Sequence, residues 1–418
     1  MLNNCDMTDN ENLNNKRIMF GQSERDYSVD LMRSISCLLV VVTHACSFLC
    51  QRIPYDDAVG VTGEWLSLAT LKCISVSATN LFLMISGIFF LSPERQVSIS
   101  KIWSKNILKL AIAFVLWCMI YAAVRITYIN GGEFEGGLFW QETLLYEFHL
   151  WYIPMMLGIY VIVPIMREIT ARAQRKIYIY IIWLMIGAMT LNTINTLCTQ
   201  FPGTTSENVI RVINDTPTAL ICQYPFYCIL GYFLYTYRPK LKMRLFLYVL
   251  GIIGVLSLTW VTTFFYVETG DPNPYLIQGK FEIYVLAKNT ALFVLVLSVF
   301  SKVRWKKVAK VIISKVSGAT LFIYLSHLLC LNAFIHEEWL LDSGYNLFWI
   351  ACIYILITYV EAFLFSLIFL QLIPWTYMRN IVLDTIWPNR RIWNGGRKKK
   401  QKDKNKDKDK ETNALRLR

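Results

Sequence analysis

Charged residues are scarce in this sequence, and several signatures of soluble enzymes are missing from it. Only 17% of the 418 residues are charged, whereas 55% are hydrophobic, and the mean hydropathy is +0.41. No GxGxxG, P-loop, GxSxG or HExxH pattern occurs, so a dinucleotide enzyme, an ATPase and a serine hydrolase have no support. The composition excludes an ordinary soluble domain and is typical of a protein that crosses a membrane many times.

The eleven cysteines lack a CxxC pair or any other paired spacing, which argues against a disulfide framework or a zinc site, and no metal is expected. Most of them lie in apolar segments, where a cysteine acts as a small hydrophobic residue. No cleavable signal peptide is predicted, because the first 28 residues are polar and rich in asparagine. The first apolar segment is expected to serve as the insertion signal.

Ten apolar segments are long enough to cross the membrane, which takes roughly 20 helical residues for about 30 Å of hydrocarbon. The expected spans lie at about 31–50, 74–91, 106–128, 150–166, 177–197, 219–236, 245–266, 282–301, 318–335 and 347–373. The sequence therefore predicts an all-α polytopic membrane protein with about ten transmembrane helices.

Lysine and arginine alternate across the segments that connect these spans. The segments assigned to the inner side carry 3, 4, 4, 4 and 6 of them (1–30, 92–109, 166–176, 238–244 and 302–315). The segments assigned to the outer side carry 2, 1, 1, 1 and 0 (50–73, 125–149, 198–218, 267–282 and 336–346). Because cytoplasmic loops collect positive charge, both termini are predicted to be cytoplasmic. The net charge of +13 is then a property of the membrane face, and nucleic acid is not an expected partner.

Four regions are expected along the chain. They are a polar cytoplasmic N-terminal tail (1–28), a membrane domain (29–376), an interfacial segment (377–396) and a disordered, lysine-rich cytoplasmic tail (397–418). The last region is of low complexity and has too few apolar residues to form a core.

Three ionisable residues lie on the first expected span: Asp30, Arg33 and His44. Because eleven helical steps complete almost three turns, the side chains of Arg33 and His44 share a face, about 20° apart and roughly 16 Å apart along the axis. Asp30 precedes Arg33 by one turn and is placed to pair with it. Ionisable groups at membrane depth are costly and usually functional. The alternatives are interfacial charges that set orientation, and a histidine that packs through a hydrogen bond.

Five stretches, in order along the chain, resemble motifs of the acyltransferase-3 family of integral membrane acyltransferases. They are "DLMRSISCLLVVVTHA", "ATNLFLMISGIFFL", "SKNILKLAIAFVLWCMIYA", "FHLWYIPMMLGIYVIVPIM" and "SGATLFIYLSHLLCL". The first stretch resembles the family's Asp-x-x-Arg and Arg-x10-His patterns, and the second contains Ser86-Gly87. The fourth ends near Pro164, and the last supplies Tyr324 and His327 as a Tyr-x-x-His motif. The resemblance covers roughly residues 25 to 375.

This resemblance implies transfer of an acyl group, most often acetyl, from a coenzyme A thioester to a sugar hydroxyl at the bacterial plasma membrane. Acetyl-CoA or another acyl-CoA is the expected donor, and a surface glycan or lipid-linked sugar is the expected acceptor. Membrane lipids and separate envelope-biosynthesis proteins are further expected partners. His44 is expected to be the general base, a role that suits an imidazole near pH 7. Arg33, held by Asp30, is expected to orient the donor's phosphates or polarise its carbonyl.

One departure from the family pattern concerns the donor. Family members often place Arg-x-x-Arg at the cytoplasmic start of the third helix, where this chain has Lys105 and Lys109. A lysine contacts a phosphate as a point charge but lacks the bidentate fork of arginine. Both residues are therefore donor-binding candidates, with ordinary positive-inside lysines as the alternative.

Other intramembrane polar residues are candidates to line a cavity: Ser86, Tyr324, His327, Lys288 and Glu361. An ion pair between Lys288 and Glu361 is favoured, because a lone charge at that depth is costly. His149 and Trp151 are expected at the outer mouth, where they either stack on sugars or belong to the interfacial aromatic belt.

Two rival functions remain open at the level of sequence. A transporter or flippase would move a glycan or a lipid-linked sugar without acyl transfer, with histidines as gates or proton relays. No inverted or tandem repeat of the kind found in many transporters is detected. A related acyltransferase would use another donor, such as succinyl-CoA, or an amine acceptor.

Overall fold

The structure, a computed structural model, describes residues 25–93, 98–129, 135–200, 204–216, 223–273, 279–333 and 344–372. In these ranges the regular elements are helices: α2 (Tyr27–Cys50), α3 (Gly63–Ser75), α4 (Thr79–Phe90), α5 (Ile99–Lys101), η1 (Ile102–Ile107), α6 (Leu108–Ile129), α7 (Gly136–Leu145), η2 (Phe148–Trp151), α8 (Tyr152–Arg172), α9 (Arg175–Gln200), α10 (Thr204–Asp215), α12 (Tyr224–Thr236), α13 (Leu241–Thr269), α14 (Ile283–Phe300), α15 (Lys307–Ala333) and α17 (Leu347–Leu372). The expected tail 397–418 and the interfacial segment 377–396 lie outside the described residues, as does most of the tail 1–28.

The all-α membrane fold is confirmed, with one difference in the number of spans. Nine helical stretches within the described ranges are long and apolar enough to cross a membrane. The sixth expected span, 219–236, is described only as the 13 residues of α12, which are too few to cross alone. Residues 217–222, which would precede this helix, lie outside the described residues. About ten spans were expected, and nine meet the length criterion.

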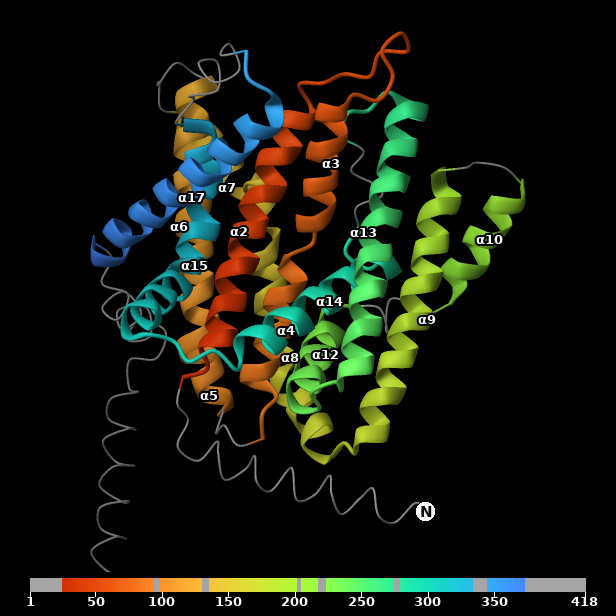
Figure 1. The fold of residues 1–418 in the computed structure, drawn as a ribbon. Coiled ribbons are helices and arrows are strands. Elements are labelled where there is room, and N and C mark those ends of the chain that lie inside the picture. The colour runs from red at the N-terminus through yellow and green to blue at the C-terminus, as the bar shows by residue number, and fades with distance from the viewer. Residues whose placement is uncertain are drawn as a thin grey trace, which may run out of the picture.

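Helix α2 lies in the middle of the bundle and packs against α3, α4, α14, α15 and α17 (Figure 1). Its buried positions recur at helical spacing, with Val29, Met32, Val40 and Ala45 among them. A helix that contacts partners on several sides is positioned by all of them. The Asp30–Arg33–His44 stripe is therefore carried by a helix that five other helices hold in place.

The second span is broken between α3 and α4. Ser77 has a φ of 60°, in the left-handed region that residues other than glycine rarely adopt. A break inside a membrane leaves backbone carbonyls that protein groups must satisfy. Lys288 Nζ donates to the carbonyl oxygens of Ile74, at 3.3 Å, and of Val76. Asn289 Nδ2 donates to the carbonyl oxygen of Ser77 at 3.1 Å, so α14 supplies the donors that the break requires.

Close backbone contact joins α4 to α12, the two short helical pieces. A Cβ atom added to Gly87 would lie 1.9 Å from the carbonyl oxygen of Cys228, and one added to Gly231 would lie 2.2 Å from that of Met84. Small residues at helix crossings let backbones approach in this way inside membranes. The Ser86-Gly87 pair of the second motif therefore lies at a helix-packing contact.

Candidate active site

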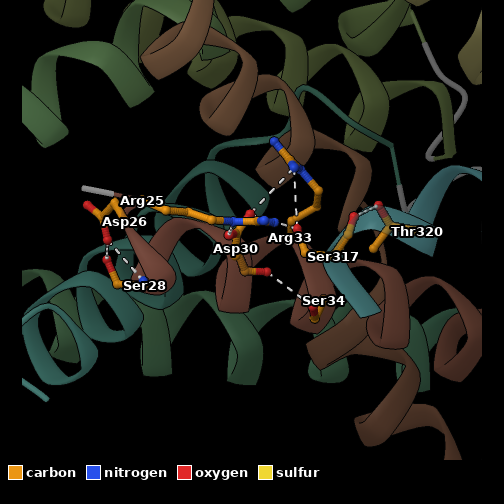
Figure 2. A network of polar contacts seen from close by, with 8 residues as sticks. All are labelled: Arg25, Asp26, Ser28, Asp30, Arg33, Ser34, Ser317 and Thr320. Atoms are coloured by element: carbon orange, nitrogen blue, oxygen red, sulfur yellow. Dashed lines mark hydrogen bonds and ion pairs between the residues drawn. The ribbon is translucent and has the colours of Figure 1, made fainter. Parts of the chain in front are cut away.

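The site begins at the N-terminus of α2, which is capped and tied to α12. Asp26 precedes the helix, and its side chain accepts a hydrogen bond from the backbone N–H of Ser28 at 3.0 Å, a standard N-cap (Figure 2). The hydroxyl of Tyr235, on α12, donates to the other oxygen of Asp26 at 2.8 Å. The first turn of α2, which carries Asp30, is thereby held in place.

Asp30 is buried, with 4% of its surface exposed, and receives three donors (Figure 2). Ser317 of α15 donates to its Oδ1 at 2.8 Å, Arg33 Nη1 lies 3.7 Å from the same oxygen, and Arg25 Nε donates to Oδ2. The hydrogen bond to Asp30 raises the pKa of Arg25, which lies before the span. Asp30 thus joins the start of α2 to α15, and Arg25 and Ser317 are partners that the sequence spacing did not predict.

The guanidinium of Arg33 is only partly engaged by its neighbours. Its Nη1 also donates to Ser317 Oγ at 3.3 Å, and its guanidinium lies 5.1 Å from the ring centroid of Phe89. The hydroxyls of Tyr152 and Tyr160, on α8, are within electrostatic range. The Arg33 side chain is 28% exposed, and its ion pair with Asp30 is long. An arginine in this state can still bind a phosphate or a carbonyl oxygen.

Three of the four histidines in the sequence meet around the other end of the stripe. The ring centroids of His44 and His327 are 5.2 Å apart with planes at 40°, and those of His149 and His327 are 5.2 Å apart with planes at 89°. His44 also contacts Phe148 at 5.5 Å and is partly exposed. His149 and His327 are 1% and 0% exposed. Helices α2 and α15 and the turn η2 therefore join in one imidazole cluster.

The hydrogen bonds of this cluster are few. Nδ1 of His327 lies 2.6 Å from the carbonyl oxygen of Tyr324, and the Tyr324 hydroxyl donates to the carbonyl oxygen of His149. Among the described residues, both ring nitrogens of His149 and Nε2 of His327 are buried without a hydrogen-bond partner. Each such group costs about 1–3 kcal/mol, and retained examples tend to lie at functional sites. A neutral imidazole cluster beside a partly exposed His44 is suited to accept a proton from a bound hydroxyl.

A family model described as an acyltransferase domain, that of the acyltransferase-3 family, matches residues 26–389. The chain belongs to this family. It is a membrane acyltransferase, and the matched range contains the whole Asp30–Arg33–His44 stripe and both buried histidines. No match was found among curated proteins or among solved structures.

The other candidate residues from the family pattern lie on elements that do not contribute to the imidazole cluster. Lys105 is in η1 and Lys109 is in the first turn of α6, and both belong to the segment predicted to be cytoplasmic (92–109). Ser86 is half-buried on α4, next to the contact with α12. Their roles in donor binding and in lining a cavity stay predictions.

The prediction that Lys288 pairs with Glu361 is wrong. The Lys288 ammonium is directed at the carbonyl oxygens of the α3–α4 break and not at Glu361, which lies half-buried on α17. The reason is the break itself, which creates acceptors for a cation near α14 that the hydropathy pattern does not reveal.

Two residues of the acyltransferase were misplaced by the sequence analysis. His149 was expected at the outer mouth, but it is buried in the cluster and its aromatic neighbour Tyr121 lies 5.1 Å away. Lys72 was counted in an outer loop, but α3 begins at Gly63, and Lys72 is buried and donates to Asn273. Its charge is within electrostatic range of His44. A longer second span, starting at residue 63, is the signal that would have identified Lys72 as intramembrane.

An aromatic group with one lysine lies at the end of η2. Lys280 Nζ lies 3.0 Å from the ring centroid of Trp151, and Tyr224 packs against both Trp151, at 5.9 Å, and Phe281, at 4.8 Å. Burial lowers the pKa of Lys280 to about 8. Trp151 therefore pairs with a cation, a role beyond that of an interfacial belt residue.

Proposed function

We propose that the chain transfers an acyl group, most commonly acetyl, from a coenzyme A thioester to a hydroxyl of a cell-surface or membrane-linked glycan in a bacterial plasma membrane. The observation that carries the proposal is the position of His44. It shares a face of α2 with Arg33, and its ring lies 5.2 Å from the buried ring of His327. Membership of the acyltransferase-3 family supports the reaction class.

In this reaction His44 acts as the general base. The acceptor hydroxyl gives its proton to a ring nitrogen of His44 while its oxygen forms a bond to the thioester carbonyl carbon. The bond between carbon and sulfur then breaks, and the coenzyme A thiolate leaves with the proton that His44 returns to it. The products are the acylated glycan and coenzyme A, and His44 ends in its starting form.

Arg33 serves the donor at the other end of the stripe. Its partly exposed guanidinium, held by Asp30 and Ser317, is a bidentate donor for a phosphate of the donor. The roughly 16 Å between Arg33 and His44 suits the extended pantetheine arm of coenzyme A. Lys105 and Lys109 would add positive charge for the nucleotide part of the donor, as point charges.

The test is mass spectrometry of surface glycans from cells that carry the wild-type gene, a deletion, His44→Ala or Thr43→Val. Thr43 is the matched control, because it lies on the same turn and donates to Ser75 at 2.9 Å but has no basic nitrogen. The expected result is loss of one acyl group per glycan repeat in the deletion and in His44→Ala, with acylation kept in Thr43→Val.

Membrane levels of each variant are measured by immunoblot, so that loss of protein is separated from loss of activity. Normal acylation with reduced surface glycan in the deletion would contradict the proposal and would favour a transporter. The mass of the lost group identifies the acyl chain and separates acetyl from succinyl.

A further inference from the structure

The direction of one hydrogen bond determines which nitrogen of His327 carries a proton. Nδ1 lies 2.6 Å from the backbone carbonyl oxygen of Tyr324, one turn earlier on α15. A carbonyl oxygen only accepts, so Nδ1 must be the donor. In the neutral ring Nε2 then holds a lone pair and no proton, which makes it a hydrogen-bond acceptor.

The Nε2 acceptor of His327 is buried and receives no hydrogen bond from a described residue. Nε2 of His327 has no hydrogen-bond partner among the described residues, and the side chain is fully buried. Two imidazoles adjoin it. The ring of His149 is perpendicular, at 89°, which directs an edge of one ring at the face of the other. The ring of His44 is tilted by only 40°, and no hydrogen bond to a described residue fixes its orientation.

We propose that His327 is a positioning residue whose Nε2 accepts the ring N–H of His44, so that the Tyr324 carbonyl, His327 and His44 form one directed chain of hydrogen bonds. The carbonyl sets the tautomer of His327, and His327 sets the tautomer of His44. The second nitrogen of His44 then points its lone pair at the acceptor hydroxyl. This inference rests on the proposed function, because it explains how His44 is oriented as the base.

The separation of the His44 and His327 rings is compatible with this chain of hydrogen bonds. A distance of 5.2 Å between ring centroids needs only rotation of the side chains to bring an N–H within reach of a ring nitrogen. Hydrogen bonds of catalytic groups are commonly long in the absence of substrate and shorten in the complex. The neighbouring backbone is fixed, since the Tyr324 hydroxyl donates to the carbonyl oxygen of His149.

This chain of hydrogen bonds leaves the proton balance of the reaction unchanged. His44 takes one proton from the acceptor hydroxyl and returns it to the departing thiolate. His327 accepts a hydrogen bond throughout, keeps its own proton on Nδ1 and stays neutral. Its contribution is greatest when His44 is an imidazolium, because a hydrogen bond from a charged donor is roughly twice as strong as a neutral one.

The experiment compares three variants in membrane vesicles that contain the full chain and its endogenous glycan, supplied with labelled acetyl-CoA. His327→Phe keeps a ring without an acceptor, and His327→Gln keeps one donor and one acceptor. Tyr121→Phe is the matched control, because it removes another buried hydrogen bond to a backbone carbonyl of α15. The kcat and the KM for acetyl-CoA are measured from label transferred to glycan, per folded molecule.

We expect kcat to fall about 10- to 100-fold in His327→Phe, with KM for acetyl-CoA unchanged, as for loss of a hydrogen bond to a charged group. His327→Gln and Tyr121→Phe should stay within about threefold of the wild type. If His327→Phe does not accumulate, His327→Met replaces it, because its flexible side chain fills irregular space.

Three results would overturn the inference. They are a wild-type kcat in His327→Phe, a change confined to KM, and a well-folded His327→Gln as slow as His327→Phe. A wild-type chain that transfers no label would instead count against the proposed function, so the two failures are distinguishable.

Discussion

The two ends of the polar stripe on α2 differ in how fully their groups are paired. At the first turn, Asp30 is surrounded by Arg25, Arg33 and Ser317, and both of its oxygens accept from these donors. Around His44, both ring nitrogens of His149 and one of His327 have no partner among the described residues. Asp30 is buried to nearly the same extent as His149 and His327, so burial alone does not explain the contrast.

This difference separates a structural role from a chemical one. A carboxylate whose two oxygens both accept hydrogen bonds joins α2 to α15 and sets where Arg33 lies. Unpaired imidazoles cost stability but keep lone pairs available, which a general base requires. We therefore expect substitution of Asp30 to act mainly on stability and substitution of His44 to act mainly on rate.

The largest expected effect is that of His44→Gln on acyl transfer. Glutamine has a similar length and polarity but no basic nitrogen, so the rate should fall about 10²- to 10⁴-fold, the usual contribution of a general base. Stability should change by less than about 1 kcal/mol, because the described contacts of His44 are ring contacts alone. The measurement is label transfer from acetyl-CoA in vesicles, together with the melting temperature in detergent. A large loss of stability with the rate per folded molecule preserved would reverse the contrast between the two ends.

The next effect is that of Asp30→Ala on stability. Removing the buried carboxylate leaves Arg25 and Arg33 facing each other without a counter-ion, and breaking a buried ion pair costs several kcal/mol. Because Arg25 and Arg33 are 49% and 28% exposed, we expect about 2 kcal/mol. Asp26→Ala is the control, since loss of an N-cap costs about 1 kcal/mol. Thermal aggregation of both variants in detergent provides the comparison, and equal losses would show that Asp30 is no more than another cap.

Runs of apolar residues predicted much of this fold. Nine spans follow from runs of apolar residues, whose burial in lipid does not depend on partners far along the chain. The break in the second span was not predictable, because Ser77 carries no glycine or proline signal. Its carbonyls are satisfied by Lys288 and Asn289, more than 200 residues later. Only tertiary structure shows that this lysine belongs to the break.

The candidate site, like the fold, was predictable from the sequence only in part. Asp30, Arg33 and His44 lie on one helix face, so helical geometry alone aligns them. Ser317 and His327 reach that face from α15, a contact between residues about 280 positions apart that no local pattern encodes. The motif that contains His149 was recognised in the sequence. Its burial was not predicted, because it depends on the turn η2, which precedes α8 and places His149 inside the bundle.

A smaller effect of opposite sign is expected at His149. His149→Phe keeps a ring beside Tyr121 and His327 but removes two buried nitrogens that have no partner. Replacing an unsatisfied polar group by an apolar one of similar shape should raise stability by about 1 kcal/mol. The melting temperature in detergent is the measurement, with Tyr121→Phe as a control that loses a made hydrogen bond and should be less stable. A destabilised His149→Phe would show that a water or a ligand satisfies this imidazole in the membrane.

The last effect is on the pH dependence of stability and concerns Lys280, a cation that pairs with a ring, unlike the carboxylate-paired arginines at the Asp30 end. Burial lowers the pKa of Lys280 from 10.5 to about 8. Between these values the unfolded chain holds a proton that the folded chain has released, so stability should rise with pH over that window. Lys280→Met has no proton to exchange, and Lys280→Arg stays charged in both states, so both should lack this slope. Melting temperatures of the three proteins from pH 7 to pH 10 test it. Parallel curves would mean that Lys280 is as well solvated in the folded protein as in the unfolded chain.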